Sequence, residues 1–277
     1  YVEPGKIAGC QVLVSRHGIP AYFESYGLMD RERNKPMQDD TLFRIYSMSK
    51  PITSVALMML WEEGRFQLSD PVHRYIPSWR NQVVWQEGEG SSMVTRRPKA
   101  PPTMQHILSH TAGLTYGGLL PGLESPVDAA YQHMGVARGD GETLMEFADK
   151  LGRVPLLYEP GSKWCYSLAT DVCGALVEII SGQPFEQFLQ ERLFSPLGMR
   201  DTGFRVSDDQ LDRFAACYVR GPDKQLLLED DPETSHYRHK RNFFSGGGGL
   251  VGTTADYMAF CEMLRQGGRY QGTQAIA

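Results

Sequence analysis

The spacing of hydrophobic and polar positions near the start of the chain predicts a β-hairpin. Residues 11–16 and 21–27 are rich in β-branched and aromatic side chains, and residues 17–20 between them have the composition of a turn. From Ser49 onward the pattern changes, because apolar residues recur at helical spacing until Gly64, which is expected to end the helix. Pro51 suits the first turn of this helix, where its missing N–H is not needed.

Helical spacing dominates the middle of the chain. It predicts further helices near residues 104–109, 142–151, 169–180, 184–193 and 254–265. Residues 87–102 are rich in Gly, Ser, Arg and Pro and are expected to form an exposed excursion, whereas the Gly- and Pro-rich residues 117–141 are expected to form a mobile lid. Strands near the start followed by helices in the middle predict an α+β fold.

Composition and charge exclude several classes of function. The 277 residues carry 28 basic and 33 acidic side chains, a net charge of −5, which gives no electrostatic footprint for nucleic acid or an anionic membrane. No apolar run approaches the about 18 residues that a membrane span needs. The five cysteines are scattered and form no CxxC pair, which favours a reducing compartment, so we expect a cytoplasmic protein. The chain begins at Tyr1, and a signal peptide upstream would not be visible.

Ser47 and Lys50 are the first candidates for chemistry. They lie three residues apart at the start of the predicted helix and therefore share one face. A serine hydroxyl is a poor nucleophile at its ordinary pKa, and a desolvated lysine beside it could accept its proton. The helix N-terminus adds N–H groups that could stabilise an oxyanion. A Ser-x-x-Lys motif alone is also compatible with a capping serine and a solvated lysine.

Later segments favour the catalytic interpretation of Ser47 and Lys50, because four motifs occur in order along the chain. They read FRIYSMSKPIT (residues 43–53), ILSHTAGL (107–114), WCYSL (164–168) and GGGGL (246–250). With these motifs the chain resembles the class C β-lactamase-like superfamily of serine hydrolases, and within it the family VIII carboxylesterases. The resemblance runs along most of the chain.

The resemblance implies a role for each motif residue. Ser47 would be the nucleophile, Lys50 would assist its deprotonation, and Tyr166 would match the tyrosine of the family's Tyr-x-Asn motif as general base or proton relay. A tyrosinate beside an ammonium would share a proton network with it. In the place of the family's Asn, which contacts the amide of β-lactams, stands Leu168. We expect Leu168 to line a more apolar substrate pocket that favours esters.

A second departure concerns the family's third motif, a Lys-Thr-Gly, Trp-x-Gly or His-x-Gly tripeptide on a strand that lines the site. No such tripeptide follows the glycine run, and no Trp follows Trp164. We therefore expect that the chain is truncated before its closing strands.

Other candidate residues have simpler explanations. His106 and His110 are four residues apart, but no Glu follows His106 as in the zincin motif, and the resemblance places His110 in a structural loop. Cys165 is expected to be a buried free cysteine rather than a nucleophile.

Together these features predict one catalytic unit of two lobes over residues 1–277. An antiparallel sheet with flanking helices would comprise about 1–46 plus 245–277, and a mostly helical lobe about 47–244. The expected function is hydrolysis of carboxylic esters with short acyl chains through an acyl-enzyme, without metal or organic cofactor. A β-lactamase or D-alanyl peptidase, an acyltransferase and a non-catalytic scaffold remain alternatives. The expected partner is a small-molecule ester or lactam, and the oligomeric state is left open.

Overall fold

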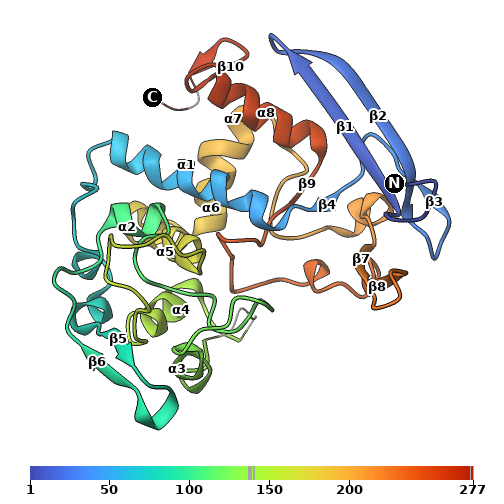
Figure 1. Ribbon diagram of the computed structural model, residues 1–277. Coiled ribbons are helices and arrows are strands. Elements are labelled where there is room, and N and C mark those ends of the chain that lie inside the picture. The colour runs from blue at the N-terminus through green and yellow to red at the C-terminus, as the bar shows by residue number, and fades with distance from the viewer. Residues whose placement is uncertain (137–138, 140, 275, 277) are drawn as a thin grey trace. The chain divides into compact units, whose positions relative to one another are not determined.

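The computed structural model describes residues 1–136, 139, 141–274 and 276, and contains both helices and strands (Figure 1). The chain divides into two compact units, each assembled from separate stretches of sequence. Unit 1 comprises Tyr1–Tyr46, Leu189–Arg241 and Gly249–Ala277. Unit 2 comprises Ser47–Phe188 and Asn242–Gly248.

Two stretches differ from the expected lobes. Residues 245–248 were expected with the sheet, whereas the structure assigns them to unit 2. Residues 189–241 were expected in the helical lobe, whereas the structure assigns them to unit 1. Arg44 shows the reason, because its side chain is only 3% exposed and pairs with Asp230 at 2.6 Å. The same guanidinium lies 3.9 Å from the ring centroid of Phe214. Contacts between residues far apart in sequence therefore hold this stretch to the N-terminal strands.

Unit 1 is built on the predicted hairpin, which the structure confirms. Strand β1 (Gly9–Arg16) pairs antiparallel with β2 (Ile19–Asp30), and β2 pairs with β3 (Lys35–Pro36). Helix α8 (Thr254–Arg265) packs beside β1, where Ser15 Oγ donates to Glu262 at 2.7 Å. The other strands and α-helices in the described part of unit 1 are β4 (Phe43–Arg44), α7 (Ser195–Leu197), β7 (Cys217–Arg220), β8 (Leu226–Asp230), β9 (Val251–Gly252), β10 (Arg269–Tyr270) and β11 (Thr273–Gln274). A π-helical turn (Gln190–Phe194) precedes α7.

Unit 2 is mostly helical, as the apolar spacing predicted. Residues 87–102, expected to be an exposed excursion, are mostly exposed and contribute to a short antiparallel ribbon of two strands, which the sequence did not predict. The strands and α-helices in the described part of unit 2 are α1 (Ser49–Glu62), β5 (Val84–Glu87), β6 (Val94–Arg96), α2 (Met104–Leu108), α3 (Asp128–His133), α4 (Leu144–Leu151) and α5 (Ala169–Ser181). Helix α6 (Phe185–Leu189) follows, and its last residue is assigned to unit 1.

The core of unit 2 forms where α1 and α5 pack against each other (Figure 1). Ile52 and Leu57 of α1 and Val172 and Leu176 of α5 have no exposed surface. Burying each of these side chains contributes roughly 1.5–3 kcal/mol. This packing fixes the first turns of both helices, to which the candidate catalytic residues are attached.

The segment expected to be a lid, residues 117–141, contains α3. Residues 137, 138 and 140 of that segment lie outside the described residues. Across the part of the chain that the structure describes, no helix has the length and apolar character needed to cross a membrane.

Candidate active site

Ser47 and Lys50 lie at the entrance to α1, in the arrangement that their spacing predicted. Ser47 is in a short 3₁₀ turn (Tyr46–Met48) directly before the helix, and its side chain is exposed. The Lys50 ammonium donates to Ser47 Oγ at 3.1 Å and to the carbonyl of Gly247 at 2.6 Å. The lysine is thus held beside the serine hydroxyl by a second, backbone acceptor.

Tyr166 completes the cluster from a distant part of unit 2. It lies three residues before α5, and its hydroxyl donates to Ser47 Oγ at 2.8 Å. The Lys50 ammonium lies 4.7 Å from the centroid of the Tyr166 ring. The structure therefore brings Ser47, Lys50 and Tyr166, the three predicted catalytic residues, into one hydrogen-bonded group.

The surroundings of Tyr166 favour its ionised form. Burial alone would raise the pKa of this phenol, but hydrogen bonds with Lys50, Ser47 and Tyr116 outweigh burial and lower the pKa below its usual value. The positive charge of Lys50 acts in the same direction. A phenol with a lowered pKa beside a serine hydroxyl is suited to accept the proton of that hydroxyl.

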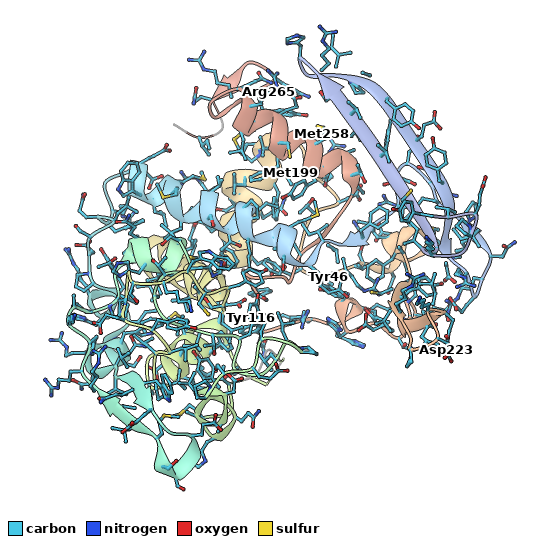
Figure 2. The ribbon with its side chains drawn as sticks, viewed as in Figure 1. Tyr46, Tyr116, Met199, Asp223, Met258 and Arg265 are labelled. Atoms are coloured by element: carbon cyan, nitrogen blue, oxygen red, sulfur yellow. The ribbon has the colours of Figure 1, made fainter. Side chains whose placement is uncertain are left out.

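Aromatic rings surround Tyr166 on several sides. Tyr116, labelled in Figure 2, is buried, and its ring centroid lies 5.1 Å from that of Tyr166. Trp164 stacks on Tyr166 at 6.1 Å with an interplanar angle of 16°, and 62% of Trp164 is exposed. His110 contacts the Tyr166 ring at 5.3 Å. These rings limit the positions of the phenol, and Trp164 adds an exposed apolar surface next to it.

His110, one of the rings around Tyr166, is neutral. Burial, assisted by the charge of Lys50, lowers the pKa of its imidazole to about 4. One ring nitrogen lies 3.1 Å from Ser167 Oγ and the other 3.3 Å from Thr170 Oγ1, so both nitrogens have a partner. Its backbone has φ +56°, in the left-handed region. The imidazole thus fixes the loop before α5 without adding charge near Tyr166.

The structure places the other candidate residues outside this cluster. Leu168 directly precedes α5 and has no exposed surface, so its burial gives no support to the predicted substrate contact. Cys165 is partly buried, and burial raises the pKa of its thiol, which opposes a nucleophilic role. His106 accepts from the Thr103 N–H at the start of α2. Among the described residues, no three His, Cys, Asp or Glu side chains gather as they would around a metal ion.

Two residues near the site were not found from the sequence. Tyr116 lies just beyond the motif of residues 107–114, and only the contact with Tyr166 reveals its importance. Asp171 follows the motif of residues 164–168 and is completely buried. The sequence offered one signal for Asp171, an acidic residue among the mostly apolar residues of a predicted helix.

Comparisons with known proteins identify the family of the chain. A sequence profile of the family described as Beta-lactamase matches residues 1–277. Esterase EstB of Burkholderia gladioli is 34% identical over 279 residues, which cover 94% of this chain and 66% of EstB. The chain thus spans slightly less than two thirds of the length of that relative.

Solved structures show the same fold. The structure of EstCE1, described as a hydrolase with promiscuous acyltransferase activity, has a TM-score of 0.81 and 33% identity, and covers 99% of this chain and 72% of EstCE1. Simvastatin synthase LovD of Aspergillus terreus has a TM-score of 0.77 and 28% identity, with 95% of this chain and 65% of LovD covered. The profile match along the whole sequence, with the β-lactamase/transpeptidase-like α+β fold, shows that the chain belongs to the beta-lactamase family.

Proposed function

We propose that the protein is a serine hydrolase that cleaves carboxylic esters of short acyl chains through an acyl-enzyme on Ser47. The observation that carries this proposal is the hydrogen-bonded group in which Lys50 Nζ and Tyr166 Oη both contact Ser47 Oγ, at 3.1 and 2.8 Å. A nucleophile with two titratable groups in hydrogen-bond reach is the arrangement that covalent catalysis needs.

The first step is acylation. When Tyr166 is ionised, the hydroxyl of Ser47 donates to the phenolate, and Ser47 Oγ attacks the ester carbonyl as its proton passes to Tyr166 Oη. Backbone N–H groups at the start of α1 are the expected donors to the tetrahedral oxyanion. Collapse of this intermediate breaks the bond to the alcohol, which leaves with the proton held by Tyr166.

The second step is deacylation. A water molecule gives its proton to Tyr166 and attacks the acyl carbonyl, and the bond to Ser47 Oγ then breaks. The carboxylic acid is released and Ser47 regains its proton. Lys50 keeps its positive charge beside Tyr166 in both steps and favours the phenolate. These steps need no metal and no organic cofactor.

The residues next to Tyr166 favour an ester over a lactam as the substrate. Leu168 stands where the family's lactam-binding Asn is expected, so the amide contact of that Asn is lost. Trp164 presents an exposed apolar face next to Tyr166, which suits an acyl or alkyl group. The similarity to esterase EstB supports the same choice.

Acyl transfer to an alcohol is the second candidate. It uses the same acyl-enzyme, with an alcohol in place of water in the second step. The similarity to EstCE1, described as having promiscuous acyltransferase activity, favours this candidate. Adding methanol or a longer alcohol to an ester assay and measuring the new ester by chromatography separates transfer from hydrolysis.

A paired assay tests the proposal. The protein and its Ser47→Ala variant are each given p-nitrophenyl butyrate and a chromogenic cephalosporin. We expect ester turnover that disappears in the variant, with little lactam turnover. Fast lactam turnover would instead indicate a β-lactamase or a D-alanyl peptidase. Absence of turnover on both substrates, together with absence of covalent labelling at Ser47, would favour a non-catalytic scaffold.

A further inference from the structure

Asp171 is a buried carboxylate that the proposed chemical steps do not use. It lies in the first turn of α5 and has no exposed surface. A carboxylate removed from water is costly unless hydrogen bonds replace its hydration. Its Oδ1 accepts from Ser245 Oγ at 2.6 Å and from the Gly247 N–H at 2.9 Å. Both donors belong to residues 245–248, which we call the glycine loop.

The glycine loop is also attached to α1. Thr53 Oγ1 donates to the carbonyl of Gly246 at 2.8 Å, and Lys50 Nζ donates to the carbonyl of Gly247 at 2.6 Å. The loop approaches both helices closely, because a β-carbon at Gly246 would lie 2.7 Å from the Thr170 carbonyl oxygen and 2.8 Å from Thr53 Cγ2. Only glycine fits at this point without displacing backbone.

We propose that Asp171 is a positioning residue that holds Lys50 at the nucleophile through the glycine loop, an inference that rests on the proposed function. The carboxylate of Asp171 binds the N–H of Gly247, and the carbonyl of that same residue binds the ammonium of Lys50. Asp171 therefore sets the place of Lys50 without touching the reacting atoms.

The lysine side chain is flexible, so Lys50 needs a fixed acceptor to stay beside Ser47. An ammonium on a flexible four-carbon stem has many rotamers, and solvent competes for its three donors. A carbonyl held in one position selects the rotamer that keeps Nζ 3.1 Å from Ser47 Oγ. Ser245 Oγ adds a second hydrogen bond from the loop to the carboxylate of Asp171. Loosening either contact would let Lys50 move away from Ser47 and Tyr166 while leaving all three catalytic side chains in the chain.

Three variants weaken the attachment of Asp171 to the glycine loop to different extents. Asp171→Ala removes both contacts to the loop, Ser245→Ala removes only the hydroxyl contact, and Asp171→Asn keeps an oxygen acceptor without the charge. Because a misplacement of about 1 Å can cost roughly 100-fold in rate, we expect kcat to fall about 100-fold in Asp171→Ala and about 10-fold in Ser245→Ala. Asp171→Asn should recover part of the loss, and KM should stay within about twofold.

Ser125→Ala is the matched control. Ser125 Oγ donates to the carboxylate of Asp128 at 2.6 Å. This serine–aspartate hydrogen bond has the same length as the one between Ser245 and Asp171, but it does not involve the glycine loop. The Ser125→Ala variant should keep the kcat of the unmodified protein. The pH dependence of kcat is the second readout, because a displaced Lys50 no longer lowers the pKa of Tyr166. The rise of kcat with pH should shift to higher pH in Ser245→Ala and stay in place in Ser125→Ala.

The outcomes separate the inference from the proposed function. If the unmodified protein neither hydrolyses esters nor labels at Ser47, the proposed function fails. If it does so, and folded Ser245→Ala and Asp171→Asn keep its kcat and pH profile, the positioning role of Asp171 is wrong. Thermal unfolding shows which variants are folded. Should Asp171→Ala not fold, the other two variants decide the question. A kcat loss that merely follows the unfolded fraction would also overturn the inference.

Discussion

At the scale of single residues, Tyr166 links the geometry to the chemistry. Its hydroxyl contacts Ser47 Oγ, its ring lies beside the Lys50 ammonium, and its pKa is lowered by these neighbours. Ser47 alone is a weak nucleophile, and Lys50 alone is a solvated cation. The three side chains acquire a catalytic arrangement only because two segments that are 119 residues apart in sequence meet in unit 2.

Removal of the Tyr166 hydroxyl tests its role as base. Tyr166→Phe keeps the ring and its packing against Tyr116 and Trp164 but removes the atom that contacts Ser47. We expect kcat for p-nitrophenyl butyrate to fall about 10²–10⁴-fold, the usual contribution of a general base. The measurement is steady-state kinetics, with thermal unfolding as the check on folding. A variant with more than half of the original kcat would show that another group accepts the proton.

The pH dependence follows from the direction of the Tyr166 shift. A base acts in its deprotonated form, so the population of competent enzyme rises as pH rises through the pKa of Tyr166. Because that pKa is lowered from its usual value of 10.0, kcat/KM for an ester should rise with pH to a plateau, with a midpoint below 10.

A pH series of kcat/KM from about 5 to 10, with enzyme stability checked at each pH, measures this midpoint. A rate that is independent of pH over the whole range would contradict the assignment of Tyr166. A midpoint at or above 10 would contradict the lowered pKa.

At the scale of the elements, the packing of α1 on α5 holds the site together. Leu57 of α1 has no exposed surface and is not one of the catalytic residues. Leu57→Ala should lower the free energy of unfolding by roughly 2–5 kcal/mol, because it leaves a cavity in a closely packed core. Denaturant unfolding measures this change.

Leu264→Ala is the matched control for that prediction, because the same side chain on α8 is 44% exposed. It should change the free energy of unfolding by no more than about 0.5 kcal/mol. If both variants lost the same free energy, the α1–α5 contact would not be the core that the structure indicates.

Sequence periodicity predicted the helices well but not every contact between them. Apolar residues at helical spacing gave the start of α1 at Ser49 and its end before Gly64, because each feature depends on neighbours in sequence. The antiparallel ribbon of β5 and β6 was missed, since Gly, Ser and Arg obscure its short strands. The link from Asp171 to Lys50 was not visible either, because the glycine loop that joins them lies 76 positions from Asp171 and 197 positions from Lys50 in sequence.

At the scale of the whole molecule, the boundary between the units was predicted at one end only. Tyr46 ends the first stretch of unit 1 and Ser47 begins unit 2, as the change of pattern suggested. The stretch Leu189–Arg241 was assigned wrongly, because the Arg44–Asp230 ion pair connects residues 186 positions apart and leaves no periodic signal. For the site, the spacing of Ser47 and Lys50 predicted that they share one helix face, whereas their catalytic roles and that of Tyr166 required the family resemblance.

Membership of the beta-lactamase family extends the account from one site to a class of enzymes. Relatives that share this fold are described as an esterase, a hydrolase with acyltransferase activity and a synthase. In the mechanism proposed for this chain, an acylated Ser47 serves hydrolysis and acyl transfer alike. The choice between them lies with the groups around the acyl-enzyme rather than with the nucleophile.

Covalent labelling shows whether Ser47 is an activated nucleophile. The protein is incubated with a fluorophosphonate probe, and mass spectrometry gives the number of labels and the labelled peptide. We predict one label on Ser47, none in Ser47→Ala, and unchanged labelling in Ser49→Ala, which alters the buried serine of the same motif. Equal labelling of Ser47→Ala, or a folded protein that does not react with the probe, would contradict the account.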